Sequence, residues 1–410
     1  MNFKKIISFF IGLITFFSII PWSSLPLSNY AFWVLVQVVF FVIILITKKY
    51  YSHNFDFKNQ WPIKIFLFWM LFSIFRGFLV AKNYWEWKNL GNSSFVLLMG
   101  FSVFVFSNVS LNRIILRNWF YFLLPLFFLA VPFFSREDAF GHYLVPITVL
   151  LLLFPLLPKK WKIIALFFMI LVVVLGPTAR SNVIKFLFAF LFGILYYIRF
   201  LLSKKIFNSI MLFLLINPIV LFILGITGTF NIFNISEYIE GEYTTDVVVK
   251  GKKKDENLTA DTRTFLYVEV LSSAINNEYI YFGRTPARGN DSQFFGKDIA
   301  NDLGLSNKER FSNEVSILNI FTWTGLVGVI LYFIVFLYAS ILAINQSNNF
   351  FAKIVGLFVS FRWMYAWVED FSRFDLSNII LWILISLCFS IKFRRMSDIE
   401  VKIWTRSIFT

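Results

Sequence analysis

Residues that carry redox and metal chemistry are scarce in this sequence. Its single cysteine, Cys388, lies in an apolar run, which excludes an intramolecular disulfide and a cysteine metal site. It has only two histidines, His53 and His142, and no HExxH, Walker or dinucleotide-binding motif. The sequence therefore predicts no metal, no cofactor and no nucleotide energy source, so any reaction must use a substrate that is already activated.

Charged residues are also few, at 15% of the 410 residues, against 58% hydrophobic residues. Soluble domains are usually about a quarter charged. The apolar residues occur in runs of about 17 to 25, which is the length that a helix needs to cross a hydrocarbon core of roughly 30 Å. These features predict an all-α fold, namely a polytopic transmembrane helix bundle.

The apolar runs, bounded by charged residues, proline, glycine and asparagine, predict twelve spans and three regions. Residues 1–230 hold nine spans, 231–313 form a large hydrophilic loop that is partly helical, and 314–410 hold three spans and a tail. The predicted spans are 5–20, 30–47, 62–81, 94–109, 117–134, 143–158, 161–177, 181–200, 206–228, 315–343, 350–369 and 376–393.

Loops that are rich in lysine and arginine alternate along the chain with loops that contain few of them. With the N-terminus in the cytoplasm, twenty cations and three acids fall on the inner side, whereas the short outer loops hold five cations. The positive-inside rule then makes both termini cytoplasmic and the 231–313 loop external. The net charge of +15 is explained by topology, and no nucleic-acid partner is predicted.

Within the external loop, residues 262–279 are predicted to form a helix. The apolar side chains at helical spacing are Phe265, Val268, Leu271 and Ile275. Asp261 is placed to cap this helix, which either lies flat on the membrane or packs over a cavity. Residues 244–254 are predicted to form a hairpin, and residues 283–291 a loop that contains glycine and proline.

Three cations fall inside predicted spans: Arg76, Lys185 and Arg362. Charge within a membrane is costly and usually functional, although long basic side chains near helix ends also reach the headgroups. All three lie in the outer halves of their helices, where the positive-inside rule disfavours them. We therefore expect them to bind an anionic ligand of the outer leaflet.

A tight turn, 176–182, joins two middle spans and carries Arg180. Ser181 or Asn182 is expected to cap the following helix, so that its N-terminus and Arg180 point to one place. Free amides, the helix dipole and a guanidinium together suit phosphate. Lys185, one turn further on, is expected to face the same way; an interfacial arginine without a ligand is the alternative.

The external loop supplies three more candidate arginines: Arg263, Arg284 and Arg288. Guanidinium groups favour phosphate and carboxylate, and a solvated surface charge is the alternative for each. Glu314 stands where hydrophobicity resumes and is either a general base towards a hydroxyl or a structural partner of an arginine. Three further acids in the last outer loop are candidates for the same role: Glu369, Asp370 and Asp375.

The span pattern, the Arg180 turn and the large late loop resemble the bacterial O-antigen polymerases (Wzy-type) and the related O-antigen ligases. Asp261-Thr262-Arg263 and then Phe282-Gly283-Arg284 match the layout of their loop, and the re-entry that ends in Gly325-Leu326-Val327-Gly328 is similar to theirs. The ligases tend to carry a histidine where this chain has Glu314, which favours a polymerase.

The resemblance implies a glycosyltransferase that polymerises undecaprenyl-pyrophosphate-linked oligosaccharides, at the outer face of the bacterial inner membrane, into O-antigen or a capsule-like polysaccharide. Glu314 would orient or deprotonate the acceptor hydroxyl. The cations that would hold the pyrophosphate and stabilise its charge are Arg180, Arg263, Arg284, Lys185 and Arg288. The implied partners are the lipid-linked oligosaccharide and membrane lipid, with a chain-length regulator and a flippase as further candidates.

Two other functions are left open by the sequence. A polysaccharide flippase also has about twelve spans and handles the same lipid, but short loops and a charged cavity through the bilayer would be expected of it. A transporter of small anions is a weaker candidate, because paired broken helices are missing from the sequence pattern.

Overall fold

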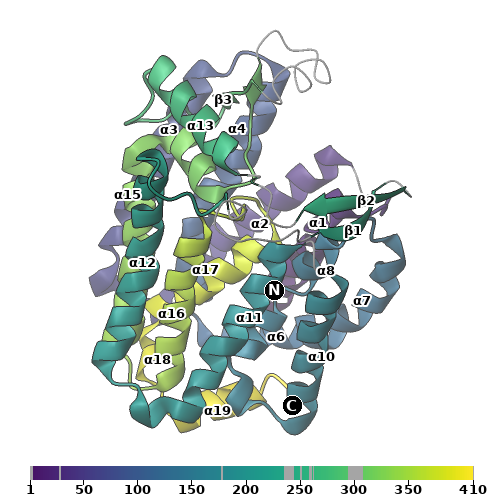
Figure 1. The fold of residues 1–410 in the computed structure, drawn as a ribbon. Helices are drawn as coiled ribbons and strands as arrows, with labels where there is room; N and C mark the ends of the chain where they lie inside the picture. The colour runs from purple at the N-terminus through teal and green to yellow at the C-terminus, as the bar shows by residue number, and fades with distance from the viewer. Residues whose placement is uncertain are drawn as a thin grey trace.

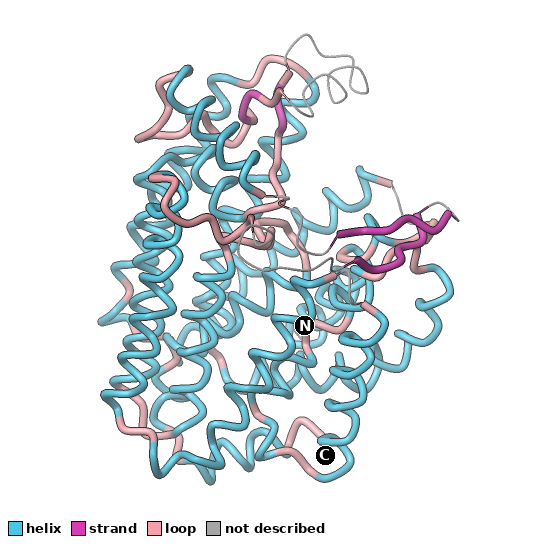
Figure 2. Tube along the Cα trace, in the orientation of Figure 1, coloured by secondary structure: helices cyan, strands magenta, loops and turns pink. Residues whose placement is uncertain are grey.

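The computed structural model describes residues 3–26, 29–176, 179–234, 244–249, 252–257, 261, 263–293 and 308–409. Helices dominate the described chain (Figure 1), and strands are confined to two small antiparallel ribbons (Figure 2). Pro177, Thr178 and Thr262, which belong to two of the predicted motifs, lie outside the described residues.

In the described part of the chain, eight helical stretches are long and apolar enough to cross a membrane. They confirm the prediction of an all-α membrane protein. The other four predicted spans coincide with shorter helices, so the number twelve stays a prediction. The eight stretches are Phe3–Trp22, Tyr30–Asn54, Trp61–Val80, Tyr84–Phe106, Val109–Phe133, Arg180–Leu201, Lys204–Ile226 and Ser316–Asn345.

The described residues of the first third of the chain form seven α-helices, of which two pairs are nearly continuous. A 3-10 turn at Leu98–Ser102 joins α4 to α5, and a π-helical turn at Trp119–Leu123 joins α6 to α7. The fourth span thus begins at Tyr84, ten residues before the prediction, because Asn83 caps a helix whose first turns are polar. The helices are α1 (Phe3–Phe17), α2 (Tyr30–Tyr51), α3 (Trp61–Val80), α4 (Tyr84–Leu97), α5 (Val103–Phe106), α6 (Val109–Asn118) and α7 (Leu124–Ala130).

The predicted span at 143–158 is broken into short helices. Pro146 and Pro155 lack amide donors and interrupt the helical ladder there. The segment is nevertheless buried, since α9 packs against α11 and α10. The helices of this region are α8 (Asp138–Tyr143), α9 (Ile147–Leu152), α10 (Lys159–Leu175), α11 (Arg180–Ile194) and α12 (Lys204–Ile226).

The last third of the chain supplies the centre of the bundle. Every residue of α17 is buried, and α16 is nearly as enclosed, between α11, α12, α15 and α17. A helix that is apolar all round belongs in such a central position. The helices are α15 (Ser316–Asn345), α16 (Phe350–Tyr365), α17 (Leu376–Phe389), α18 (Ile391–Arg395) and α19 (Asp398–Arg406).

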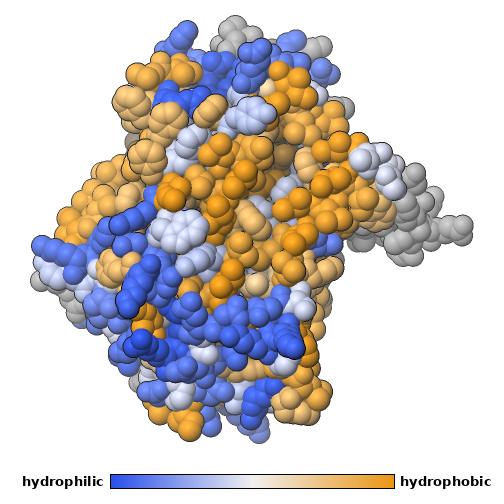
Figure 3. Space-filling model, turned by 90° about the vertical axis from the view of Figure 1, so that its left-hand side faces the viewer, coloured by the Kyte–Doolittle hydropathy of each residue, from blue (hydrophilic) through white to orange (hydrophobic). Residues whose placement is uncertain are grey.

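The two ends of the bundle differ in what they carry (Figure 1). One end, called the loop end here, holds α13 (Thr264–Asn276) and the ribbon of β3 (Asn290–Asp291) and β4 (Glu309–Arg310). The opposite end, called the tail end, holds α18 and α19. Figure 3 shows apolar surface between hydrophilic patches near the top and in the lower part of one side, as expected of a membrane-embedded surface.

The predicted hairpin and loop helix are both present. β1 (Thr244–Val249) pairs antiparallel with β2 (Lys252–Asn257). The Asp261 carboxylate accepts hydrogen bonds from the amides of Arg263 and Thr264 at 3.0 and 2.9 Å, which confirms its predicted action on the first turn of α13.

The predicted apolar stripe of α13 does not pack inward, so of its two predicted placements the one over a cavity is wrong for this stripe, and the one flat on the membrane stays a prediction. Val268 and Ile275 are 57% and 64% exposed. The stripe that packs inward includes Glu269, whose carboxylate accepts from the Ser292 hydroxyl at 2.8 Å, so a purely apolar pattern missed it. The buried side chains of α13 are Leu266, Tyr267, Glu269, Val270, Ser273 and Ala274.

α15 is broken at Gly325, whose φ of 71° and ψ of −174° interrupt the helix. Residues 280–284 of the loop run across the break. The amide of Leu326 donates to the carbonyl oxygen of Ile280 at 2.8 Å, and the amide of Arg284 donates to that of Thr322 at 2.7 Å. The loop thus satisfies backbone groups that the break would leave unpaired.

This break joins the two motifs that the sequence resemblance singled out. Gly283, which also has a positive φ, lies so close that an added Cβ would stand 2.5 Å from the amide nitrogen of Gly325. A Cβ on Gly325 would stand 2.2 Å from the carbonyl oxygen of Tyr281. Both positions therefore require glycine, for conformation and for space.

We expect Gly283→Ala and Gly325→Ala each to cost at least about 1–3 kcal/mol, because the positive-φ backbone is strained by a side chain and the Cβ meets backbone atoms. Thermal unfolding of the purified protein in detergent measures the loss. Gly91→Ala is the matched control, since nothing lies within 4 Å of its Cβ and α4 is helical there. A wild-type melting temperature for both test variants would contradict this packing.

Candidate functional site

The connector between α16 and α17, residues 366–375, organises the loop end. The amides of Ser316 and Ile317, at the N-terminus of α15, donate to the carbonyl oxygens of Glu369 and Ala366 at 3.1 and 3.0 Å. A helix N-terminus has free amide donors that need acceptors. The connector supplies them and fixes where α15 begins.

α13 is held by the same connector. The Tyr267 hydroxyl donates to the carbonyl oxygen of Trp367 at 2.5 Å, and Nε of Arg263 donates to that of Val368 at 3.4 Å. α13, α15 and α16 thus all meet at the ten-residue connector.

The Glu369 carboxylate is shared by two buried cations. Nζ of Lys185, on α11, lies 2.8 Å from one carboxylate oxygen, and Nη1 of Arg362, on α16, lies 3.1 Å from the other. All three side chains are less than 10% exposed. Two cations that the sequence predicted separately as ligand-binding groups therefore meet on one carboxylate.

Glu314 is shared by two arginines in the same way. Its carboxylate lies 2.6 Å from Nη1 of Arg263 and 3.7 Å from Nη2 of Arg310. The Glu314 side chain is 53% exposed, whereas that of Arg263 is 26% exposed. Of the two roles predicted for Glu314, the structure contains the arginine pairing, and the role as a base stays a prediction.

Arg180 is the first residue of α11, as expected, but the predicted caps are wrong. The residue before the helix is Ala179, which makes no side-chain bond to it. Asn182 is fully buried, with Nδ2 donating to the carbonyl oxygen of Asp138 at 3.4 Å, and Ser181 lies within the first turn. Capping was assigned to residues that the helix already contains.

Tyr365, at the end of α16, is a site residue that the sequence reasoning missed. Its hydroxyl is buried and has no hydrogen-bond partner among the described residues. Arg180, Arg263, Arg362 and Glu369 all lie close enough to interact with it electrostatically. The spacing of three residues from Arg362, which places both on one helix face, was the available signal.

Around Tyr365, the described residues bring five cations together with two shared carboxylates, and the connector acids Asp370 and Asp375 act on some of the same cations. Two carboxylates, Glu314 and Glu369, each serve two cations, and Arg180 is added to them. The cations are Arg180, Lys185, Arg263, Arg310 and Arg362. Closely spaced guanidinium and ammonium groups attract anions, most strongly where the surrounding protein excludes water.

Arg284 and Arg288 belong to a second cluster, centred on the buried Glu309 of β4. Arg284 also pairs with Asp291 at 2.8 Å, and Nε of Arg288 lies 3.8 Å from Glu86 of α4. The hydrogen bond to Glu309 raises the pKa of Arg288. Both predicted phosphate ligands are thus engaged by carboxylates of the loop and of α4.

Arg76, on α3, contacts the loop backbone. Its guanidinium donates to the carbonyl oxygens of Phe282 and Gly283 at 2.6 and 3.1 Å. The structure places this predicted ligand-binding cation under the loop crossing, where it holds the segment that fills the break in α15.

The shared carboxylate predicts an order of stability among variants. Glu369→Gln leaves Lys185 and Arg362 as two buried cations without a counter-charge, which costs about 3–5 kcal/mol. Lys185→Met leaves Arg362 paired and should cost clearly less. Thermal unfolding in detergent measures both. Equal melting temperatures for the two variants would contradict the central role of Glu369.

Asp375 predicts a pH effect. It caps α17, with its carboxylate accepting from the amide of Asn378 at 2.8 Å, and burial raises its pKa to about 6. Because this pKa exceeds the unfolded value of 3.8, the folded state holds the proton more tightly. The resulting stabilisation is complete below about pH 4 and is lost as the pH rises through 6.

Asp375→Asn keeps an acceptor for the cap and removes the titration. The neighbouring charges that the variant leaves in place are Arg373, Asp370 and Lys185. We expect the free energy of unfolding of the variant, relative to that of the wild type, to rise by on the order of 2 kcal/mol between pH 4 and pH 8. Thermal unfolding at each pH measures this difference. A difference between the two proteins that does not change with pH would contradict this assignment.

No protein-family model matches this chain, and no curated protein matches its sequence.

Proposed function

We propose that the chain is a metal-independent glycosyltransferase of the bacterial inner membrane, with twelve spans and both termini in the cytoplasm. It would polymerise undecaprenyl-pyrophosphate-linked oligosaccharide repeat units into O-antigen or a capsule-like polysaccharide at the outer face. The observation that carries the proposal is the cluster at the loop end, where two carboxylates are each shared by two cations and Arg180 adds further positive charge.

The pyrophosphate of the donor lipid is the anion that this cluster suits. Arg263 and Arg180 have guanidinium groups, which bind phosphate oxygens in pairs. Lys185 and Arg362 are already neutralised in part by Glu369. They would not contact the pyrophosphate directly but would stabilise its negative charge electrostatically. Preorganised charge of this kind stabilises a leaving group as its negative charge develops.

In the proposed reaction, the acceptor hydroxyl oxygen attacks the anomeric carbon of the donor sugar. A carbon–oxygen bond forms there as the bond to the pyrophosphate breaks, and the electron pair leaves with undecaprenyl pyrophosphate. The hydroxyl proton passes to Glu314. Since Glu314 is bonded to Arg263 in the structure, pyrophosphate that takes over Arg263 would free the carboxylate to act as the base.

Tyr365 has a defined place in this proposal. Its hydroxyl has no hydrogen-bond partner among the described residues and interacts electrostatically with Arg180 and Arg263, so it is expected to donate a hydrogen bond to the bound pyrophosphate. A buried hydroxyl without a partner carries a desolvation cost that such a bond would offset.

The experiment uses purified protein in vesicles that contain lipid-linked repeat units, with product length read on a gel. Arg263→Ala and Glu314→Gln are each expected to lower the polymerisation rate by at least about a hundredfold, and Tyr365→Phe by about tenfold or more. The controls are Arg406→Ala on α19 and Tyr338→Phe on α15, whose hydroxyl donates to Oδ1 of Asn59 and not to a residue of the cluster. All variants are first matched for folding by melting temperature.

Wild-type polymer length from folded Arg263→Ala or Glu314→Gln would overturn the assignment. Translocation of the lipid-linked unit without any polymer would identify a flippase instead. Transfer of finished polymer to a lipid A acceptor, with no lengthening, would identify an O-antigen ligase.

A further inference from the structure

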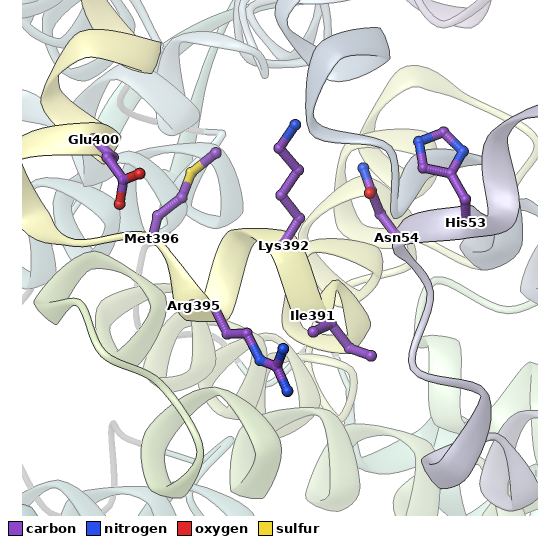
Figure 4. A pocket seen from close by; sticks show the side chains of 7 residues that line it. All are labelled: His53, Asn54, Ile391, Lys392, Arg395, Met396 and Glu400. Carbon is purple, nitrogen blue, oxygen red and sulfur yellow. The ribbon is translucent and has the colours of Figure 1, made fainter.

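The tail end of the bundle carries two hollows beside the last turn of α2. One, of about 380 Å³, is lined by the turn after α2, by α18 and by the start of α19 (Figure 4). The other, of about 400 Å³, lies along α2 itself. The first is lined by His53, Asn54, Ile391, Lys392, Arg395, Met396 and Glu400, and the second by Leu45, Ile46, Lys48, Lys49 and Ser52.

Four cations line these two hollows: Lys48, Lys49, Lys392 and Arg395. Among the described residues, none of the four forms an ion pair. Lys48 and Lys49 rest instead over the rings of Phe104 and Tyr50, at 4.1 and 4.9 Å from the ring centroids. In Figure 4, the Lys392 side chain extends into the space between Asn54 and His53 on one side and Met396 and Glu400 on the other.

The nearest acids are already engaged. Asp56 pairs with Arg394, and the Glu400 carboxylate accepts from the amide and hydroxyl of Ser397 at 2.7 and 3.0 Å. Glu400 lines the first hollow and keeps its negative charge, so among the described residues four cations face one carboxylate and the two hollows together present a net positive charge. An anion is the complementary ligand.

The walls of the first hollow are fixed before any ligand arrives. The amide of Asp56 donates to the carbonyl oxygen of Phe389 at 3.0 Å, which ties the turn after α2 to the end of α17. His53 is held on both ring nitrogens, by the carbonyl of Tyr50 and by the side-chain amide of Asn108, at 3.2 and 3.3 Å. A site with a rigid frame loses little entropy on binding.

Apolar surface leads directly into the second hollow. Val42, Leu45 and Ile46 are about half exposed on α2, one to two turns before Lys48 and Lys49. A ligand that fits both features has an anionic head and an apolar tail. Basic pockets beside membrane helices are known places for acidic lipid headgroups.

We propose that the tail ends of α2 and α18 form a binding site for an anionic phospholipid. Lys48, Lys49, Lys392 and Arg395 hold its phosphate, and its acyl chains lie along the exposed apolar face of α2. The site is independent of the reaction proposed for the loop end, and the lipid would fasten the turn after α2 to the C-terminal helices.

The test measures binding of phosphatidylglycerol, with phosphatidylcholine for comparison, to the full-length protein in detergent by native mass spectrometry. Lys392→Gln/Arg395→Gln is expected to lower the affinity for phosphatidylglycerol by on the order of tenfold or more. Lys402→Gln/Arg406→Gln is the matched control, because it removes the same charge from the same end of the bundle, away from the hollows. Only Lys392→Gln/Arg395→Gln should lower the affinity for phosphatidylglycerol.

An equal loss of affinity for phosphatidylglycerol in both double variants would mean a diffuse charge effect and would overturn the proposed site. Equal affinity of the wild type for phosphatidylglycerol and phosphatidylcholine would overturn it as well. If Lys392→Gln/Arg395→Gln fails to fold, Lys48→Gln/Lys49→Gln serves in its place. Inorganic phosphate is added as a competitor. Full displacement of the lipid by millimolar phosphate would overturn the lipid assignment and leave a soluble phosphate ligand, whereas retention of the lipid supports it.

Discussion

The carboxylate of Glu369, held between Lys185 and Arg362, is the interaction on which the loop end depends. Two cations from α11 and α16 could not remain buried side by side without it, because an uncompensated buried charge costs several kcal/mol. The same residue accepts the first amide of α15 through its backbone. One acid therefore determines how three helices of the bundle meet.

The described residues of the loop segment 231–313 are organised from this point outward. α13 bonds the connector next to Glu369, Arg263 reaches from α13 to Glu314, and residues 280–284 complete the broken α15. The described residues of the segment are thus fixed to the bundle by several hydrogen bonds and an ion pair. Arg263 of the segment, Arg180 of α11 and Arg362 of α16 all interact electrostatically with Tyr365.

The sequence predicts what depends on local pattern. The length of the apolar runs predicts the membrane helices, and the position of Asp261 predicts the first turn of α13. It could not give Glu369 as the partner of Lys185, because the two are 184 residues apart and only tertiary packing joins them. The inward face of α13 was also missed, since a buried Glu269 with its own hydrogen bonds does not follow the apolar pattern.

A structure of the full-length protein with undecaprenyl pyrophosphate, determined by cryo-electron microscopy in lipid nanodiscs, tests the central claim most directly. The account predicts pyrophosphate density against Arg180, Arg263 and the Tyr365 hydroxyl, with Glu314 released from Arg263. Pyrophosphate bound elsewhere, with the Arg263–Glu314 pair intact, would contradict it.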